Sequence, residues 1–311
     1  MKDEILRRIE RDAGVPELAE LLAARIQQAD LHSLLLEVFR RRAAARAPAD
    51  VLADWEANRL VRASTADPRA LARFDAAAFA RLPDGFEPLE LSPVCPLGTS
   101  SVLGTVHQDK ALASARSVEV LSDATNVLAL ECAARRRASL RADARSTSAV
   151  HLAASHRHLR TQAFAGPLSF AHFRLFALAS AGRDARGERF AEAALAAHLR
   201  FHARVAREFL GPGFALRIGV TDLAPGEPRA RLLAGVPGVE VVAAPERTSG
   251  RGYYTDLCFK IHARRGAGDW LELGDGGAVD WTAKLLSNQK ERLFISGISS
   301  ERIMSLAAEP S

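Results

Sequence analysis

The first 82 residues carry apolar side chains at the spacing of amphipathic helices. Leucines and isoleucines recur three or four positions apart, for example at Leu18, Leu21, Leu22 and Ile26. This spacing places them on one face of a helix. Pro48 and Pro68 mark breaks, and Leu82-Pro83-Asp84-Gly85 is the clearest turn. We therefore predict a helical N-terminal segment at residues 1–85 and a core domain at residues 86–311.

After residue 86 the pattern changes to short apolar runs separated by turns, which is typical of strands. The predicted strands are residues 89–94, 117–121, 214–220, 239–242, 253–261, 270–273 and 293–298. Longer periodic stretches predict helices at residues 126–140, 188–210 and 300–306. Asp123 or Thr125 is suited to cap the first of these. Because strands and helices mix without steady βαβ alternation, we predict an α+β fold with a mostly antiparallel sheet flanked by helices.

Composition narrows the class of protein without identifying it. The 311 residues are 48% apolar and 25% charged, as in ordinary globular proteins. No apolar run approaches the roughly 18 residues that span a bilayer, and the acidic N-terminus lacks a secretory pattern. Three widely separated cysteines favour reduced thiols, so we expect a cytoplasmic protein without membrane contact. The net charge of +5 comes almost wholly from arginine and does not by itself indicate nucleic-acid binding.

Residues 159–176 form the most informative stretch. Arg160 and Gln162 end one strand-like run, and after a Gly/Pro-containing turn the chain returns with His172 four positions before Phe176. A guanidinium suits phosphate because it donates two parallel hydrogen bonds, and an aromatic ring can stack on a nucleobase. The hairpin therefore favours a nucleotide site. The alternative is a half-buried hairpin with a phenylalanine in the core and Arg160 in solvent.

Four segments in order resemble those of class II aminoacyl-tRNA synthetases, within their histidyl-tRNA synthetase-like branch. The segment Val120-Leu121-Ser122-Asp123-Ala124-Thr125 resembles the one whose acid and threonine hold the substrate's α-amino group. That resemblance implies the same role for Asp123 and Thr125. The hairpin is similar to motif 2 of that class.

The motif 2 resemblance implies a role for each polar or aromatic residue of the hairpin. Arg160 would bind the α-phosphate and the acyl carboxylate, and so stabilise the reaction's charge. His172 would face the γ-phosphate and Phe176 would stack on adenine. Gln162 stands where the family has a glutamate.

Two further segments complete the resemblance. The run Gly252-Tyr253-Tyr254-Thr255 resembles the Tyr-Tyr-Thr-Gly strand of the histidyl branch, and Gly276-Gly277-Ala278-Val279-Asp280 resembles its Gly-Gly-Arg-Tyr-Asp. These matches imply substrate contacts from Tyr253, Tyr254, Gly276, Gly277 and Asp280. An arginine of that branch has no exact match here, since Ser249 takes its position between Arg247 and Arg251. Residues 294–302 resemble motif 3, which implies that Arg302 contacts the γ-phosphate.

The resemblance implies ATP-dependent activation of an amino acid or related carboxylate as an acyl-adenylate, with Mg²⁺ as cofactor. Glu272 and Asp275 are candidate magnesium ligands. Histidine is not the expected substrate, because Leu178 and Gly182 occupy the matching positions that recognise imidazole. A homodimer is expected, as is the lack of a C-terminal anticodon-binding domain, so this would be a paralogue of the tRNA synthetases. The residues do not indicate whether tRNA or a carrier accepts the acyl group.

Two other functions stay open. The first is a catalytically inactive regulatory or small-molecule-sensing paralogue, similar to the regulatory subunit of ATP phosphoribosyltransferase. The change to Gln162 and the displaced arginine near Ser249 favour it. The second is a helical adaptor, built from residues 1–85 on a defunct core. Retention of Arg160, His172, Phe176 and Arg302 favours ATP use over a pure sensor.

Overall fold

The computed structural model describes residues 2–104, 106–162, 170–185, 189–223, 236, 238–250 and 252–308. The chain divides into two compact units. One consists of Met1–Arg62 with Ala113–Val118, and the other of Ala63–Leu112 with Glu119–Ser311. Within the described part of the chain, no helix is both long and apolar enough to cross a membrane.

The first unit consists of the predicted helices and one turn. Its helices are α1 (Lys2–Ala13), α2 (Leu18–Glu20), the π-helix η1 (Leu21–Arg25), α3 (Gln28–Ala44) and α4 (Pro48–Ala57). Gly14 adopts a positive φ of 65° directly after α1, and Pro48 is the first residue of α4, where its missing N–H costs nothing. Gln28 and His32 of α3 both bond the Ser117 hydroxyl, at 2.7 and 2.6 Å. These two bonds tie the 113–118 turn to the helices.

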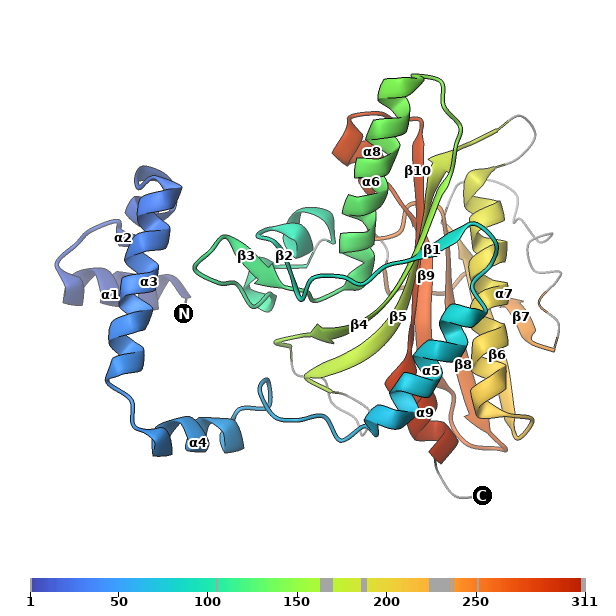
Figure 1. The fold of residues 1–311 in the computed structure, drawn as a ribbon, viewed down its shortest axis with the longest axis horizontal. Helices are drawn as coiled ribbons and strands as arrows, with labels where there is room; N and C mark the ends of the chain where they lie inside the picture. The colour runs from blue at the N-terminus through green and yellow to red at the C-terminus, as the bar shows by residue number, and fades with distance from the viewer. Residues whose placement is uncertain are drawn as a thin grey trace. The chain divides into compact units, whose positions relative to one another are not determined.

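An eight-stranded sheet organises the second unit (Figure 1), in the order β1-β4-β5-β10-β9-β8-β6-β7. Its strands are β1 (Phe86–Pro88), β4 (Val150–Leu159), β5 (His172–Arg183), β6 (Phe214–Asp222), β7 (Glu240–Ala243), β8 (Leu257–Arg265), β9 (Leu271–Val279) and β10 (Glu291–Ser299). The two edge pairs, β1–β4 and β6–β7, are parallel and the others are antiparallel. The predicted α+β fold with a mostly antiparallel sheet is therefore confirmed.

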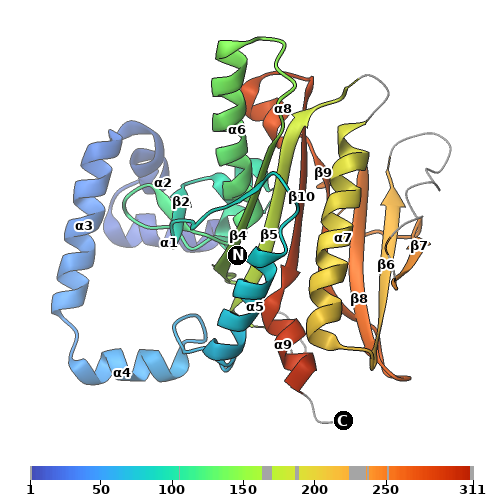
Figure 2. The same ribbon diagram turned by 45° about the vertical axis from the view of Figure 1, so that its right-hand side comes forward.

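Helices cover the sheet on both faces (Figure 2). One face packs on α5 (Pro68–Ala80), α7 (Phe190–Leu210) and α9 (Ser300–Ala308), and the other on α6 (Ala124–Ala142) and α8 (Trp281–Leu286). Each face has its own apolar cluster. Phe176, Phe259 and Phe294 belong to the first, whereas Ala177 and Ile295 belong to the second. Neighbouring residues of one strand thus enter different cores, as the period of two requires.

Several boundaries differ from the pattern-based expectation. Residues 89–93 are irregular rather than a strand, and the short strand β2 (Val94–Pro96) instead pairs with β3 (Val118–Val120). Pro93 lacks the N–H that a strand interior needs. Strand β9 continues through Gly276 and Gly277 to Val279, whereas the sequence predicted a strand only at residues 270–273, because glycines interrupt its apolar pattern without interrupting its pairing.

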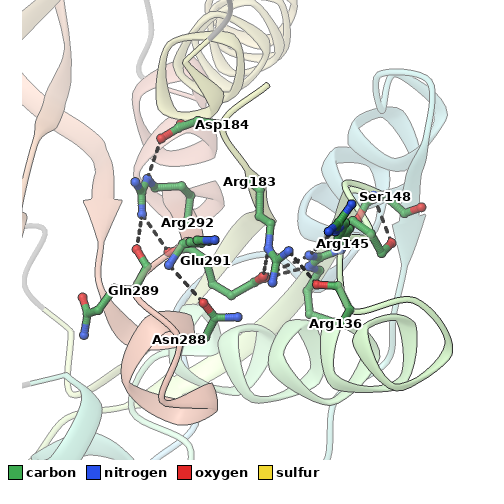
Figure 3. A network of polar contacts seen from close by, with 12 residues as sticks. Arg136, Arg145, Ser148, Arg183, Asp184, Asn288, Gln289, Glu291 and Arg292 are labelled. Carbon is green, nitrogen blue, oxygen red and sulfur yellow. Dashed lines mark hydrogen bonds and ion pairs between the residues drawn. The ribbon is translucent and has the colours of Figure 1, made fainter. Parts of the chain in front are cut away.

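A buried ion-pair network joins α6 to β5 and β10 (Figure 3). Arg136 and Glu291 have no exposed side-chain surface and bond in parallel, with Nε–Oε2 at 2.8 Å and Nη2–Oε1 at 3.0 Å. Arg183 donates a further bond to Glu291 Oε1 at 2.5 Å, and Arg136 also donates to the backbone oxygens of Ser146 and Ser148. Burial would raise the pKa of Glu291, but the bonds from the two arginines outweigh it and lower the pKa below 4.5.

Replacing Glu291 with glutamine is expected to lower the free energy of unfolding by about 3–5 kcal/mol at pH 7, because two buried guanidinium groups lose their counter-charge. Since folding lowers the pKa of this carboxyl, its contribution is complete above pH 4.5 and is lost as the pH falls through the folded-state value. Urea unfolding from pH 7 to pH 3 checks this. The control is Glu240→Gln, which removes an exposed pair with Arg217 and should cost at most about 1 kcal/mol. Equal losses in the two variants would contradict the assigned role.

Candidate functional site

A cavity of about 620 Å³ opens on the face of the sheet that also carries α6 and α8. Its walls come from four residues at the start of α6, from Arg160 and Gln162 after β4, and from five residues before β8. The first group is Ser122, Asp123, Thr125 and Asn126, and the last is Arg247, Ser249, Gly250, Tyr253 and Tyr254. Strands β5, β8, β9 and β10 form the floor. This volume lies within the range of small-molecule and cofactor sites, about 300–1,000 Å³.

On β5, the phenylalanine that lines the cavity is Phe173, not Phe176. Phe176 is fully buried on the opposite face, with ring centroids of Phe79 and Phe201 at 4.9 and 5.4 Å. Residues 173 and 176 are an odd number apart, so a strand points them to opposite faces. Phe173 lines the cavity, and the Arg160 guanidinium lies 5.1 Å from its ring centroid. Phe176 therefore cannot stack on a ligand in this cavity.

His172 shares the face of Phe176 and is also not among the cavity residues. Its Nδ1 lies 3.0 Å from Nη1 of Arg157, which in turn pairs with Glu301 of α9 at 2.8 Å. The four-residue spacing of His172 and Phe176 does put them on one face, as the sequence suggests. That face packs against α9 and the core.

Arg160 and Asp123 meet at the wall that α6 provides. Asp123 is the N-cap predicted from the sequence, and its Oδ1 accepts bonds from the backbone N–H of Thr125 at 3.0 Å and from its hydroxyl at 2.8 Å. Its other oxygen lies 3.6 Å from Arg160 Nη2. Buried His158 fixes this helix start, because its Nε2 accepts the Ala124 N–H at 3.0 Å. Burial lowers the pKa of His158 to about 3, which keeps that nitrogen available as an acceptor.

Arg247 is held firmly beside Tyr254 and Asp275. It donates to the backbone oxygens of Ser249 and Phe259 at 2.8 and 2.9 Å, and its Nη2 lies 3.1 Å from Asp275. Its guanidinium also lies 5.2 Å from the Tyr254 ring. The hydroxyl of Tyr254 bonds Asp275. Burial raises the pKa of Asp275, although the charge of Arg247 opposes that rise.

The neighbouring tyrosine, Tyr253, also lines the cavity and bonds Thr125 through its hydroxyl. Its ring packs edge-on against Tyr254 and Trp281, with centroids 4.9 and 5.4 Å apart. Burial raises the pKa of both tyrosines well above 10, so both hydroxyls keep their protons and can donate.

Arg302 and Lys260 lie at the cavity's other end, next to Glu272. Lys260 pairs with the Glu272 carboxylate at 2.6 Å, and Arg302 donates to the Glu272 backbone oxygen at 2.8 Å. Among the residues that the structure describes, no three histidine, cysteine or acidic side chains are grouped to hold a metal ion. Glu272 and Asp275, the candidate magnesium ligands, are engaged by Lys260 and Arg247 instead.

Gly276, Gly277 and Asp280 are not among the residues that line the cavity. A Cβ at Gly277 would lie 2.5 Å from Tyr254 Cδ1, and one at Gly276 would lie 2.5 Å from the Cβ of Ser296. The glycines therefore let the tyrosine and the neighbouring strand pack closely. Asp280 pairs with Lys284 at 2.9 Å at the start of α8. Arg251 lies outside the described residues.

Several cavity residues were not singled out from the sequence. They are Lys110, Asn126, Phe173, Leu175 and Lys260. The alternation of side chains along β5 predicts that Phe173 and Leu175 share one face of the strand. The sequence pattern alone does not indicate which of the two faces lines the cavity. Lys260 lies five residues after Thr255 and inside a predicted strand, and Lys110 lies outside the matched segments, but the resemblance implies no role for either.

No protein-family model and no curated protein matches this chain. Solved structures do match. They include apo histidyl-tRNA synthetase from S. aureus, with a TM-score of 0.54, 14% identity, and coverage of 76% of this chain and 64% of that one. An ATP phosphoribosyltransferase regulatory subunit/histidyl-tRNA synthetase from Bacillus halodurans matches with a TM-score of 0.58, 12% identity, and coverage of 80% and 82%.

The RNA binding domain of threonyl-tRNA synthetase from Cryptosporidium parvum matches with a TM-score of 0.54, 10% identity, and coverage of 77% and 63%. The chain thus spans less than two thirds of the S. aureus and C. parvum chains. The identities are low, so the likeness establishes the fold alone. That fold is the one shared by the class II aminoacyl-tRNA synthetases, as the motifs predicted.

The two phenylalanines of β5 should respond differently to truncation. Phe176→Ala is expected to lower the free energy of unfolding by about 3–5 kcal/mol, because it empties a fully buried ring site. Phe173→Ala removes a partly exposed ring at the cavity and should cost about 1 kcal/mol or less. Denaturant unfolding of both variants measures the difference. Comparable losses would show that Phe173 belongs to the core.

Proposed function

We propose that the cavity binds ATP together with an amino acid or related carboxylate, and that it joins them as an acyl-adenylate with release of pyrophosphate. One observation supports this most strongly. Arg160, Arg247 and Arg302 come from three distant parts of the chain, yet they line one cavity together with the ring of Phe173. Guanidinium groups suit phosphate oxygens, and an aromatic ring beside them suits a nucleobase.

The balance of charge in the cavity favours an anion. Its described lining holds five lysine and arginine side chains against three carboxylates. Each carboxylate already has a cationic neighbour, with Asp123 next to Arg160, Asp275 next to Arg247 and Glu272 next to Lys260. Lys110 and Arg302 then have no carboxylate partner in the described chain. Their charge is available to a triphosphate.

The proposed reaction assigns a task to each end of the cavity. Asp123 and the hydroxyl of Thr125 would hold an ammonium group, since one supplies charge and the other an acceptor oxygen. Arg160, 3.6 Å from Asp123, would then meet both the carboxylate of that substrate and the α-phosphate. When the carboxylate attacks phosphorus, a preorganised guanidinium stabilises the charge that develops there. Phe173 takes the adenine-stacking role expected of Phe176.

The residues do not fit a magnesium site made by the protein alone, because Glu272 and Asp275 are engaged by cations. Magnesium commonly binds through substrate phosphates and few protein carboxylates. We therefore treat any metal as part of the ATP substrate and assign no step to a resident ion. The expected homodimer stays a prediction.

A second function, binding without chemistry, has specific support. Gln162 supplies no charge where a glutamate is usual, and His172 and Phe176 face away from the cavity. One of the similar structures is the ATP phosphoribosyltransferase regulatory subunit/histidyl-tRNA synthetase from Bacillus halodurans. A sensor of this kind would bind a small molecule in the same cavity and form no adenylate.

Amino-acid-dependent exchange of pyrophosphate into ATP tests the proposal. The wild-type protein should catalyse exchange, and Arg160→Ala should reduce it by at least about 100-fold, through loss of charge stabilisation at the α-phosphate. Arg141→Ala, at an exposed position of α6, is the matched control and should leave the rate unchanged. Full activity in Arg160→Ala would contradict the assigned role. Calorimetric binding of an amino acid without any exchange would favour the sensor.

A further inference from the structure

The part of the cavity floor that β5 and β10 contribute is mainly apolar, and this limits the ligand. Strand pairing brings Ala177 of β5 next to Gly297 of β10, and Ala179 next to Ile295. Two residues further along the same face, Leu175 pairs with Ser299. Leu175, Gly297 and Ile295 line the cavity. This part of the floor therefore has Gly297 at its centre, with Leu175 and Ile295 on either side, whereas Ala177 and Ala179 are fully buried.

Leu175 leans over the glycine at the centre of the floor. A Cβ added at Gly297 would lie 2.3 Å from Leu175 Cδ2, so the leucine occupies the space that a side chain there would need. Leu175 and Ile295 both belong to the apolar cluster that includes Tyr254. The floor is thus continuous with the hydrophobic core under α6 and α8.

The polar side chains around this floor already have partners. Ser296 points to the far face, where His198 and His202 bond its hydroxyl at 2.8 and 2.7 Å. Ser299 accepts the Arg302 N–H at 3.3 Å, and Ser122 bonds Ser100 at 2.7 Å. None of these hydroxyls is directed at a ligand on the floor.

Asn126 is the exception among the side chains near the floor. Its Oδ1 is buried and has no hydrogen-bond partner. The amide lies against Gly104, where an added Cβ would lie 2.9 Å from its Nδ2. Because Oδ1 is closed off from solvent, a ligand side chain on the floor cannot reach it without movement of that wall. If that wall moved, Asn126 would offer a hydrogen bond to a polar ligand side chain. A polar side chain is therefore the alternative to an apolar one.

We propose that the carboxylate substrate carries an apolar side chain, which lies on Leu175, Gly297 and Ile295 while Asp123 holds its amino group. The inference rests on the proposed function for the placement of the amino group. A polar side chain that lies on these three residues would lose water, and none of their side chains offers a hydrogen bond in return. A site of this kind prefers aliphatic or aromatic ligands, and each methylene in contact changes affinity by roughly 10- to 200-fold.

This assignment corrects the sequence-based reason for excluding histidine. Leu178, taken as a recognition position, is fully buried and pairs with Ser296 on the far face of the sheet. Gly182 lies against the Phe190 ring, 2.5 Å from where its Cβ would be. The expectation that histidine is not the substrate stays a prediction. It now rests on the apolar surface of Leu175 and not on Leu178 and Gly182.

Calorimetric titration with a panel of free amino acids, without ATP, tests the inference directly. Leucine, isoleucine, valine, methionine and phenylalanine are expected to bind at least tenfold more tightly than serine, asparagine, glutamine, histidine, lysine and aspartate. Leu175→Asn should weaken binding of the best apolar ligand by tenfold or more. Val102→Asn, an exposed position that does not line the cavity, is the matched control and should not change it.

The outcomes separate this inference from the proposed reaction. Apolar binding without pyrophosphate exchange would support the inference and overturn the catalysis. Exchange that requires a polar or charged amino acid would overturn the inference and keep the catalysis. Tightest binding of asparagine or glutamine would assign recognition to Asn126 instead, and no binding by any amino acid would also overturn the inference. If Leu175→Asn does not fold, the wild-type panel still decides.

Discussion

The site depends on one constraint, that successive side chains of β5 and β10 must point to opposite faces of the central sheet. Both faces are covered, so each residue enters either a helix-packed core or the cavity side. A shift of one residue in register would exchange Phe173 with its neighbour His172 and remove the aromatic ring from the cavity. The pairing of ten residues of β4 with β5 prevents this shift. The register of these strands therefore determines which side chains a ligand in the cavity would contact.

The sequence predicts the fold well where the signal is local. The long helices, the Asp123 cap and most strands follow from spacing and capping chemistry, and the motifs in order predict the arrangement of the sheet. The site is harder to predict because the run from Leu175 to Ala179 is apolar on both faces, as in any doubly covered strand. The spacing of His172 and Phe176 places them together, but only the three-dimensional register shows that they face α9. Lys260 lies only five residues after Thr255, but the resemblance gives it no role, and only the strand pairing places it at the site.

Charge is handled differently in the two parts of the second unit. At one end of the sheet, Arg136, Arg183 and Glu291 are bonded to one another and largely shielded from water, so they serve structure. At the cavity, the Arg160–Asp123 and Lys260–Glu272 pairs are partly exposed, and exposed pairs contribute little to stability. Such pairs can exchange partners at small cost when a charged ligand arrives. The contrast marks the cavity as the place where charge is available for binding.

Within the cavity, the two central arginines are not equally free to change partner. Arg247 makes hydrogen bonds to two backbone oxygens and to Asp275, and only 6% of its side chain is exposed. Arg160 is 36% exposed, and its contacts to Asp123 and to the Ser122 backbone are long, at 3.6 and 3.4 Å. A ligand ammonium could take over Asp123, and Arg160 would then turn to an anion at little cost. Arg247 would provide a fixed positive charge, whereas Arg160 would change its partner from Asp123 to the ligand's anion. A substrate with both an amino group and a carboxylate requires this arrangement.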